Sequence, residues 1–292
     1  MVMTAIPFTK MNGCGNDFII IDNRTRYVRE SDLSNFARTI CTKNFAIGAD
    51  GLLLLDDSEI YDFKMRLFNP DGSEGEMCGN GARCIALFAF TNGIAPKTMA
   101  FETKAGKVDA HIIEPTKVRI TLPEIIKSQE IHTGTISGQD GNFSYQYSSL
   151  FLGVPHCVIF LPEKIPTIKL FTIGREIRFN NKYFPKGINV NFVEIMGNNS
   201  LFVHTYERGV EQVTLACGTG SASSAVVAAS KHLITSPVTV QTQGGTLIVD
   251  FLQNATYIQA ISLQGAVNVV AQGTYYPSSF NSNLIHLDED GR

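Results

Sequence analysis

The chain has 292 residues and a net charge of −3 at pH 7, with 44% hydrophobic and 17% charged residues. Its length suggests one large or two medium domains, with enough apolar residues for a sizeable core. The near-neutral charge argues against a nucleic-acid partner or an anionic membrane surface.

Taken in chain order, the sequence alternates short strand-like runs with a few helices. The first residues lack a signal-peptide pattern and no apolar run approaches the ~20 residues of a membrane span, so we expect a cytoplasmic protein. A helix is expected within 31–44, with Ser31 or Asp32 as its cap, and two more at 81–91 and 221–232. Runs rich in β-branched and aromatic residues predict strands at 17–22, 64–68, 108–113, 117–122, 157–161, 190–195, 201–206, 246–251 and 256–261.

The chain contains an internal repeat. The segment "MCGNGARCIALF" from Met77 and the segment "ACGTGSASSAVV" from Ala216 both read Cys-Gly-x-Gly and then become apolar, 139 residues apart. The same offset relates "TKAGKV" (103–108) to "TQGGTL" (242–247) and "FAIGAD" (45–50) to "FPKGIN" (184–189). Matching segments in the same order indicate two homologous domains.

The predicted fold is therefore α/β, with two homologous domains. Each is expected to be a curled, largely antiparallel sheet around a central helix. The first domain spans residues 1–122, and residues 266–292 are expected to return to it. The second spans residues 123–265.

Six cysteines occur: Cys14, Cys41, Cys78, Cys84, Cys157 and Cys217. A chain of this length without a secretion signal does not indicate a disulfide framework. No Cys-x-x-Cys pair or His-Glu-x-x-His motif is present, so no metal site is expected. The default interpretation of each cysteine is a small buried hydrophobic residue.

Cys78 and Cys217 differ from the other cysteines because each begins one copy of the repeat. A helix start offers free N–H groups and the positive end of the helix dipole, which bind a carboxylate and favour a thiolate. Two such starts facing each other suit proton exchange at a stereocentre: one thiolate removes a Cα proton and the opposite thiol returns one. No lysine is placed convincingly for a pyridoxal Schiff base, so no cofactor is expected.

Other interpretations stay open. Both cysteines are structural core residues in the simplest alternative. "GTGSAS" from Gly218 resembles a dinucleotide fingerprint, but its third glycine is replaced by Ser223 and the next acidic residue, Asp250, lies too far along. A thiol redox protein would use Cys84, six residues after Cys78, but such positions point to different helix faces. The same fold could also form a non-catalytic binding module.

Seven motifs resemble those of the diaminopimelate epimerase family. They are "KMNGCGNDFIIID" (10–22), "GADGLLLL" (48–55), "FNPDGSEGEMCGNGARC" (68–84), "PHCV" (155–158), "GINVNFV" (187–193), "YERG" (206–209) and "ACGTGSA" (216–222). They span nearly the whole chain. The double Cys-Gly motif is shared with proline-racemase-like and phenazine-biosynthesis-like folds, whereas "NPDGSE" with "YERG" is more specific.

The resemblance implies a pyridoxal-free isomerase that interconverts LL- and meso-diaminopimelate in a site between two domains. It also implies a homodimer and a small-molecule amino-acid substrate. Cys78 and Cys217 match the catalytic pair, with His156 and Glu207 as groups that support the thiols. The matching substrate-binding positions are Asn16, Asn69, Gly79, Asn80, Asn189, Glu207, Arg208, Gly218 and Thr219.

One position departs from the family pattern. The family usually reads Gly-Asn-Pro-His-Cys, and here Val154 stands in the place of that asparagine. The asparagine belongs to the shell around the far end of the substrate, and valine can neither donate nor accept a hydrogen bond. A site that lacks a buried polar contact discriminates less sharply. The alternative function is therefore an amino-acid racemase of relaxed specificity, with glutamate as one candidate substrate.

Overall fold

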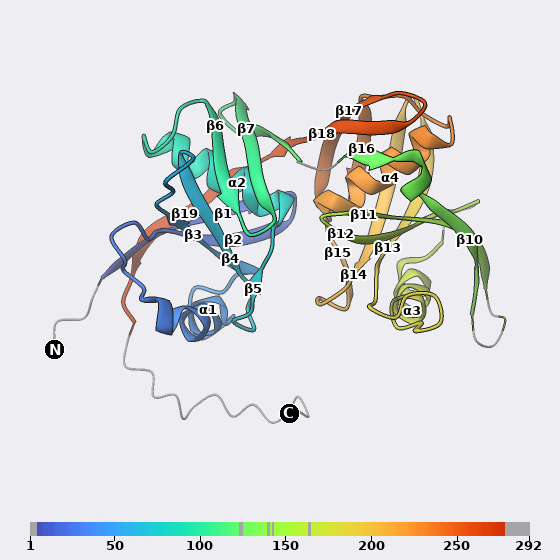
Figure 1. Ribbon diagram of the computed structural model, residues 1–292. Coiled ribbons are helices and arrows are strands. Elements are labelled where there is room, and N and C mark those ends of the chain that lie inside the picture. The colour runs from blue at the N-terminus through green and yellow to red at the C-terminus, as the bar shows by residue number, and fades with distance from the viewer. Residues whose placement is uncertain (1–4, 123–124, 139–140, 142, 163–164, 278–292) are drawn as a thin grey trace.

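The computed structural model of the protein describes residues 5–122, 125–138, 141, 143–162 and 165–277. Figure 1 shows two lobes side by side, each a curled sheet wrapped around one central helix, α2 (Gly79–Thr91) or α4 (Gly218–Ser230). The fold is α/β, as the sequence predicts.

The first lobe holds the earlier elements of the chain. They are β1 (Ile6–Gly13), β2 (Asn16–Asp22), η1 (Glu30–Asp32), α1 (Leu33–Cys41), β3 (Gly51–Asp56), β4 (Phe63–Phe68), β5 (Glu74–Gly75), α2, β6 (Thr98–Thr103), β7 (Gly106–Glu114) and β8 (Lys117–Thr121).

The later elements begin with a short connecting segment, β9 (Ile126–Lys127) and η2 (Ser128–Glu130). They continue with β10 (His132–Ser137), β11 (Ser144–Leu152), β12 (Val154–Phe160), α3 (Thr167–Arg178), β13 (Asn189–Gly197), β14 (Ser200–Glu207), β15 (Gln212–Thr214), α4, β16 (Val238–Thr242), β17 (Gly245–Gln253), β18 (Tyr257–Ala266) and β19 (Asn268–Tyr275).

Strand pairing repeats between the two lobes. In the first, β1–β2 is antiparallel, β2–β3 parallel, β3–β4 antiparallel, β4–β6 parallel and β6–β7 antiparallel. In the second, β11–β12, β12–β13, β13–β14, β14–β16 and β16–β17 follow the same sequence of directions. The helices also fall at matching points, because α1 and α3 follow the second strand of each series, and α2 and α4 follow β5 and β15. The duplication read from the sequence is therefore visible in the topology.

The lobes are joined through the last strands of the chain. β18 pairs with β17 of the second lobe and with β8 and β9. β19 then pairs with β1, so the chain after Ala266 lies in the first lobe. Residues 278–292, which the sequence analysis also assigned to this return, lie outside the described residues.

The central helices are buried on nearly every side. In α2 all residues from 79 to 89 are buried, and in α4 the same holds for 218 and 220–229. A helix that is apolar all round belongs inside a core, and small residues let the sheets close around it. Both helices begin at the glycine of Cys-Gly, before the expected starts at 81 and 221, so Cys78 and Cys217 are the N-cap residues.

The outer helices cover the sheets from outside. α1 buries Leu33, Ala37, Ile40 and Cys41, a helical spacing that the sequence analysis recognised within 31–44. α3 was not predicted. It packs through Leu170, Gly174 and Ile177, and a methyl group on Gly174 would lie 2.7 Å from the Cβ of Tyr206.

No helix within the described residues is long and apolar enough to span a membrane. The same residues hold no group of three His, Cys, Asp or Glu side chains arranged to bind a metal ion.

Candidate active site

The two cysteine-capped helix starts meet between the lobes. A methyl group on Gly218 would lie 3.6 Å from the Cα of Gly79, and one on Gly79 would lie 3.9 Å from the Cα of Gly218. Leu263 of β18 packs against both glycines. The two helix starts therefore pack directly against each other, with ordinary van der Waals spacing around both glycines.

Cys217 is buried and held by the first turn of α4. Its Sγ accepts a hydrogen bond from the Gly220 amide at 3.3 Å and lies 3.6 Å from Oγ1 of Thr219. Burial, and then the nearby Glu207 carboxylate, raise the pKa of this thiol well above its usual value, although the Thr219 and Gly220 donors oppose the shift. Cys217 is therefore a protonated thiol at neutral pH.

Cys78 is partly exposed, and its environment differs. Burial and Glu207 raise the pKa of this thiol, and the Gly81 and Asn80 amides and the Arg83 charge lower it. The net direction is upward. The expectation that the helix starts lower the thiol pKa values is therefore wrong, because desolvation of the anion outweighs the helix-terminal donors.

Glu207 lies at the end of β14, beside Cys217. Its Oε1 accepts a hydrogen bond from Oγ1 of Thr214 at 2.6 Å. Burial raises the pKa of the Glu207 carboxyl, while hydrogen bonds from Thr214 and Cys217 act in the opposite direction. This environment places a proton acceptor of raised basicity next to the Cys217 thiol.

His156 is fully buried in β12, and its orientation is fixed by Asn191. The Asn191 Nδ2 lies 3.2 Å from Nδ1 of His156 and 2.9 Å from the Cys157 carbonyl, and Thr205 donates to Asn191 Oδ1 at 2.9 Å. An amide donor at Nδ1 leaves the proton on Nε2. Burial, and then the charge of Arg208, lower the pKa of His156 to about 3, so the ring is neutral at physiological pH.

Asn189 and Arg208 lie beside His156. Asn189 is paired with His156 across β12 and β13, and its Oδ1 accepts from the Arg208 amide at 2.7 Å. The Arg208 guanidinium donates to the Lys186 carbonyl at 3.2 Å and remains half-buried. These contacts hold an arginine, whose planar fork suits a carboxylate, at the end of β14.

Asn16 and Asn80 form one polar chain. Nδ2 of Asn80 donates to Asn16 Oδ1 at 2.6 Å and to the Ala216 carbonyl at 3.3 Å. Asn16 in turn donates to Oδ2 of Asp50 at 3.4 Å. The chain connects the start of α2 to the residue before Cys217 in the other lobe.

Asn69 is the exception among the predicted site residues. It is exposed in the turn after β4, and its amide donates to Oγ of Ser73 at 3.0 Å. Among the described residues its contacts stay within this turn and the adjoining β5, next to Gly75.

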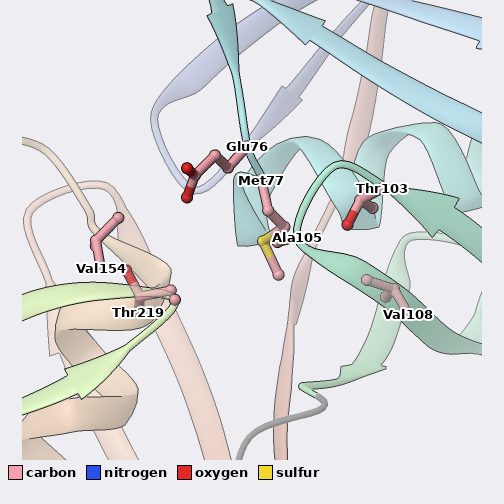
Figure 2. A pocket seen from close by; sticks show the side chains of 8 residues that line it. Glu76, Met77, Thr103, Ala105, Val108, Val154 and Thr219 are labelled. Atoms are coloured by element: carbon pink, nitrogen blue, oxygen red, sulfur yellow. The ribbon is translucent and has the colours of Figure 1, made fainter.

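A small pocket of about 40 Å³ opens between the lobes. Figure 2 shows Glu76, Met77 and Thr103 on one side and Val154 and Thr219 on the other, with the Glu76 carboxylate pointing across toward Val154. This volume suits a water molecule rather than an amino acid.

Three residues of this site were not predicted from the sequence. Asn191 orients His156, Gly220 holds the Cys217 sulfur, and Arg83 is fully buried beneath the start of α2. Of these three, only Arg83 could have been recognised from the sequence, because it is the single charged residue of α2.

A comparison with known protein families identifies the family of this chain. A family model described as diaminopimelate epimerase matches residues 8–124 and 149–270. The chain belongs to the diaminopimelate epimerase family. Membership makes the protein an isomerase, and the match covers both lobes and both cysteine-capped helices.

Curated relatives agree along almost the full length. A diaminopimelate epimerase from Methanocella arvoryzae is 43% identical over 267 residues, covering 88% of this chain and 94% of the relative. One from Aquifex aeolicus is 39% identical over 281 residues, covering 92% of this chain and 97% of the relative.

Solved structures share the fold at low identity. A probable proline racemase from Agrobacterium radiobacter K84 superposes with a TM-score of 0.71 at 14% identity, covering 95% of this chain and 94% of that chain. A hydroxyproline epimerase from Agrobacterium vitis gives a TM-score of 0.71 at 14% identity, over 96% of this chain and 93% of that chain.

Proposed function

We propose that this protein interconverts LL- and meso-diaminopimelate by moving the Cα proton between Cys78 and Cys217 without a cofactor. The observation that carries the proposal is the contact between Gly79 and Gly218, which brings the two cysteine-capped helix starts together in a member of this family. Thiols on opposite sides of one carbon are what inversion requires, because the proton leaves one face and returns to the other.

The helix starts also help to remove the Cα proton, which is only weakly acidic. In each helix the first N–H groups have no intrahelical acceptor. The amides of Gly79, Asn80, Gly218 and Thr219 are these groups at the two starts. A substrate carboxylate between them gains negative charge as the proton leaves, and aligned donors in a closed site stabilise that charge.

One thiol must lose its proton before the reaction begins. Glu207 beside Cys217 is the group placed to accept it, because its carboxyl has a raised pKa. The neutral His156 offers Nε2–H as a hydrogen-bond donor within the same site. For the far end of the substrate we assign Arg208 to the carboxylate, with Asn16 and Asn189 as further polar contacts. Asn69 is added from the family resemblance alone, since it lies exposed in the turn after β4.

The direct test is an assay of the purified chain with LL-diaminopimelate and no added pyridoxal phosphate. We expect conversion to the LL/meso equilibrium mixture, followed by chiral chromatography. Absence of any meso isomer with a folded, reduced protein would contradict the proposal. Parallel assays with glutamate, lysine and histidine measure the substrate range.

A second candidate, a racemase of relaxed specificity, rests on Val154. This side chain lines the pocket in the place where the family usually has asparagine, and it offers no polar contact there. Activity on glutamate comparable to that on diaminopimelate would favour this second candidate.

We also propose that the protein is a cytoplasmic homodimer. The support is the resemblance to the diaminopimelate epimerase family. Sedimentation at micromolar concentration tests the dimer, with a single species at twice the chain mass of 32.0 kDa as the expected result.

A further inference from the structure

Arg83 is a fully buried arginine in the second turn of α2. Its guanidinium donates to the Gly79 carbonyl at 3.2 Å, to Oδ1 of Asn80 at 2.7 Å and to Sγ of Cys14 at 3.4 Å. Its Nε has no hydrogen-bond partner, and within the described part of the chain no carboxylate forms an ion pair with it. A buried cation without an anion is costly, so its presence needs an explanation.

The Arg83 contacts fix the amide of Asn80. Because Oδ1 of Asn80 accepts from Arg83, Nδ2 must point the other way, toward Asn16 and the Ala216 carbonyl. Ala216 directly precedes Cys217. Arg83 thus orients the Asn80 amide, which links the two helix starts that carry the thiols. Arg83 itself lies behind the first turn of α2.

The second repeat has no equivalent of this arginine. The 139-residue offset places Ala222 opposite Arg83 and Thr219 opposite Asn80. Beside Cys217 lies the Glu207 carboxyl instead. The two thiols of a duplicated fold therefore stand in unequal electrostatic surroundings, with a cation behind Cys78 and a carboxyl group beside Cys217.

We propose that Arg83 is a positioning residue that holds Asn80 in place and provides the positive charge that stabilises the Cys78 thiolate. The groups that face Cys78 are Arg83 and Cys84 from α2, Glu207 from β14 and Cys217 from α4. Arg83 is the only one of these that carries a positive charge. Its guanidinium is held on Gly79 and Asn80, the two residues that directly follow Cys78, so its charge lies at the start of the helix that Cys78 caps.

The test measures the thiols directly. The alkylation rates of Cys78 and Cys217 by iodoacetamide are followed separately by peptide mass spectrometry across a pH series. The variants of the full chain are Arg83→Met, which removes the charge, Arg83→Gln, which keeps a donor, and Arg83→Lys, which keeps the charge. Leu87→Ala, at a buried position one turn further along α2, controls for lost stability.

We expect the alkylation midpoint of Cys78 to rise by about one pH unit in Arg83→Met and Arg83→Gln, the size of effect of one nearby charge. In Arg83→Lys the midpoint should stay close to that of the parent, and Cys217 should not move in any variant. If Arg83→Met does not fold, the difference in the Cys78 alkylation midpoint between Arg83→Lys and Arg83→Gln tests the proposal. An unchanged Cys78 midpoint in the uncharged variants, or an equal shift in Leu87→Ala, would overturn the proposal.

A second readout is the pH profile of kcat/KM, which rests on the proposed function. Its acid limb should move upward by about the same pH interval in the uncharged variants. If the alkylation midpoint shifts and no variant or parent epimerises diaminopimelate, the role of Arg83 stands and the proposed function fails. If activity is present and its acid limb does not move, Arg83 has no role in the reaction.

Discussion

At the scale of single residues, burial and helix-terminal donors compete for the state of the two thiols. The first-turn amides favour the thiolates of Cys78 and Cys217, and burial disfavours them more strongly. Both thiols are therefore protonated at neutral pH. Activation has to come from charged groups that enter or surround the site, which is why Glu207 and Arg83 matter beyond their packing.

His156 gives a prediction about stability. Its folded pKa of about 3 lies below the ordinary 6.5, so the unfolded chain binds a proton that the folded chain does not. Stability is then lost as pH falls below about 6.5, by about 2 kcal/mol at pH 5. The melting temperature of His156→Gln should fall less steeply between pH 7.5 and 5 than that of the parent.

The matched control is His232→Gln, at an exposed histidine just after α4. It should keep the parent's slope. Parallel slopes for the parent and His156→Gln would show that His156 is not held neutral by burial.

Val154 gives a prediction about selectivity. Val154→Asn restores an amide where the family usually has one, next to Thr219 in the pocket. One recovered hydrogen bond is worth about 1 kcal/mol, so the kcat/KM ratio for diaminopimelate over glutamate should rise about fivefold to tenfold. Competition assays with both amino acids measure the ratio. An unchanged ratio would remove Val154 as the source of relaxed specificity.

At the scale of secondary-structure elements, the first turns of α2 and α4 have similar sequences but different neighbouring residues. A methyl group on Gly220 would collide with Oδ1 of Asn191 and lie 2.9 Å from Oγ1 of Thr205, both behind His156. A methyl group on Gly81, the equivalent position, would meet only side-chain ends of Leu53 and Met65, no closer than 3.3 Å.

Gly220→Ala should therefore cost about 1–3 kcal/mol of stability and most of the activity, because Asn191 must move. Gly81→Ala should change the free energy of unfolding by less than about 1 kcal/mol. Urea unfolding of the two variants measures both quantities. Equal losses in the two would mean that the Asn191 network is not what makes the first turn of α4 sensitive.

The elements also show how much of the fold could be predicted from the sequence. The central helices and nine of the nineteen described strands were predicted, because apolar runs and turn residues mark them locally. α3 was not predicted, since Gly174 and the β-branched Thr and Ile residues around it lower helix propensity, and the helix packs on the sheet through Leu170, Gly174 and Ile177.

The site was predictable only in part. The cysteines and glycines were visible because the repeat places them in register. The contacts of His156 with Asn191 and of Arg83 with Cys14 were not, because these partners come from segments far apart in the chain. The direction of the thiol pKa shifts could not be inferred either, because it depends on how closely the lobes pack.

At the scale of the whole molecule, the duplication brings the two cysteine-capped helix starts together. A mild thiol oxidant should join Cys78 and Cys217 and abolish activity, and dithiothreitol should restore it. Inactivation should be faster at higher pH, since the thiolate is the reactive form and both pKa values are raised. Peptide mapping identifies the linked pair. Full activity after oxidation would contradict a facing pair of thiols.

The central claim is that two thiols on opposite faces exchange the Cα proton, and deuterium incorporation tests it most directly. In D2O without pyridoxal phosphate, the parent enzyme should place deuterium at the Cα of the product. Cys78→Ala and Cys217→Ala, measured separately by mass spectrometry, should each lose epimerisation by several orders of magnitude. Full epimerisation by either single variant would contradict the account.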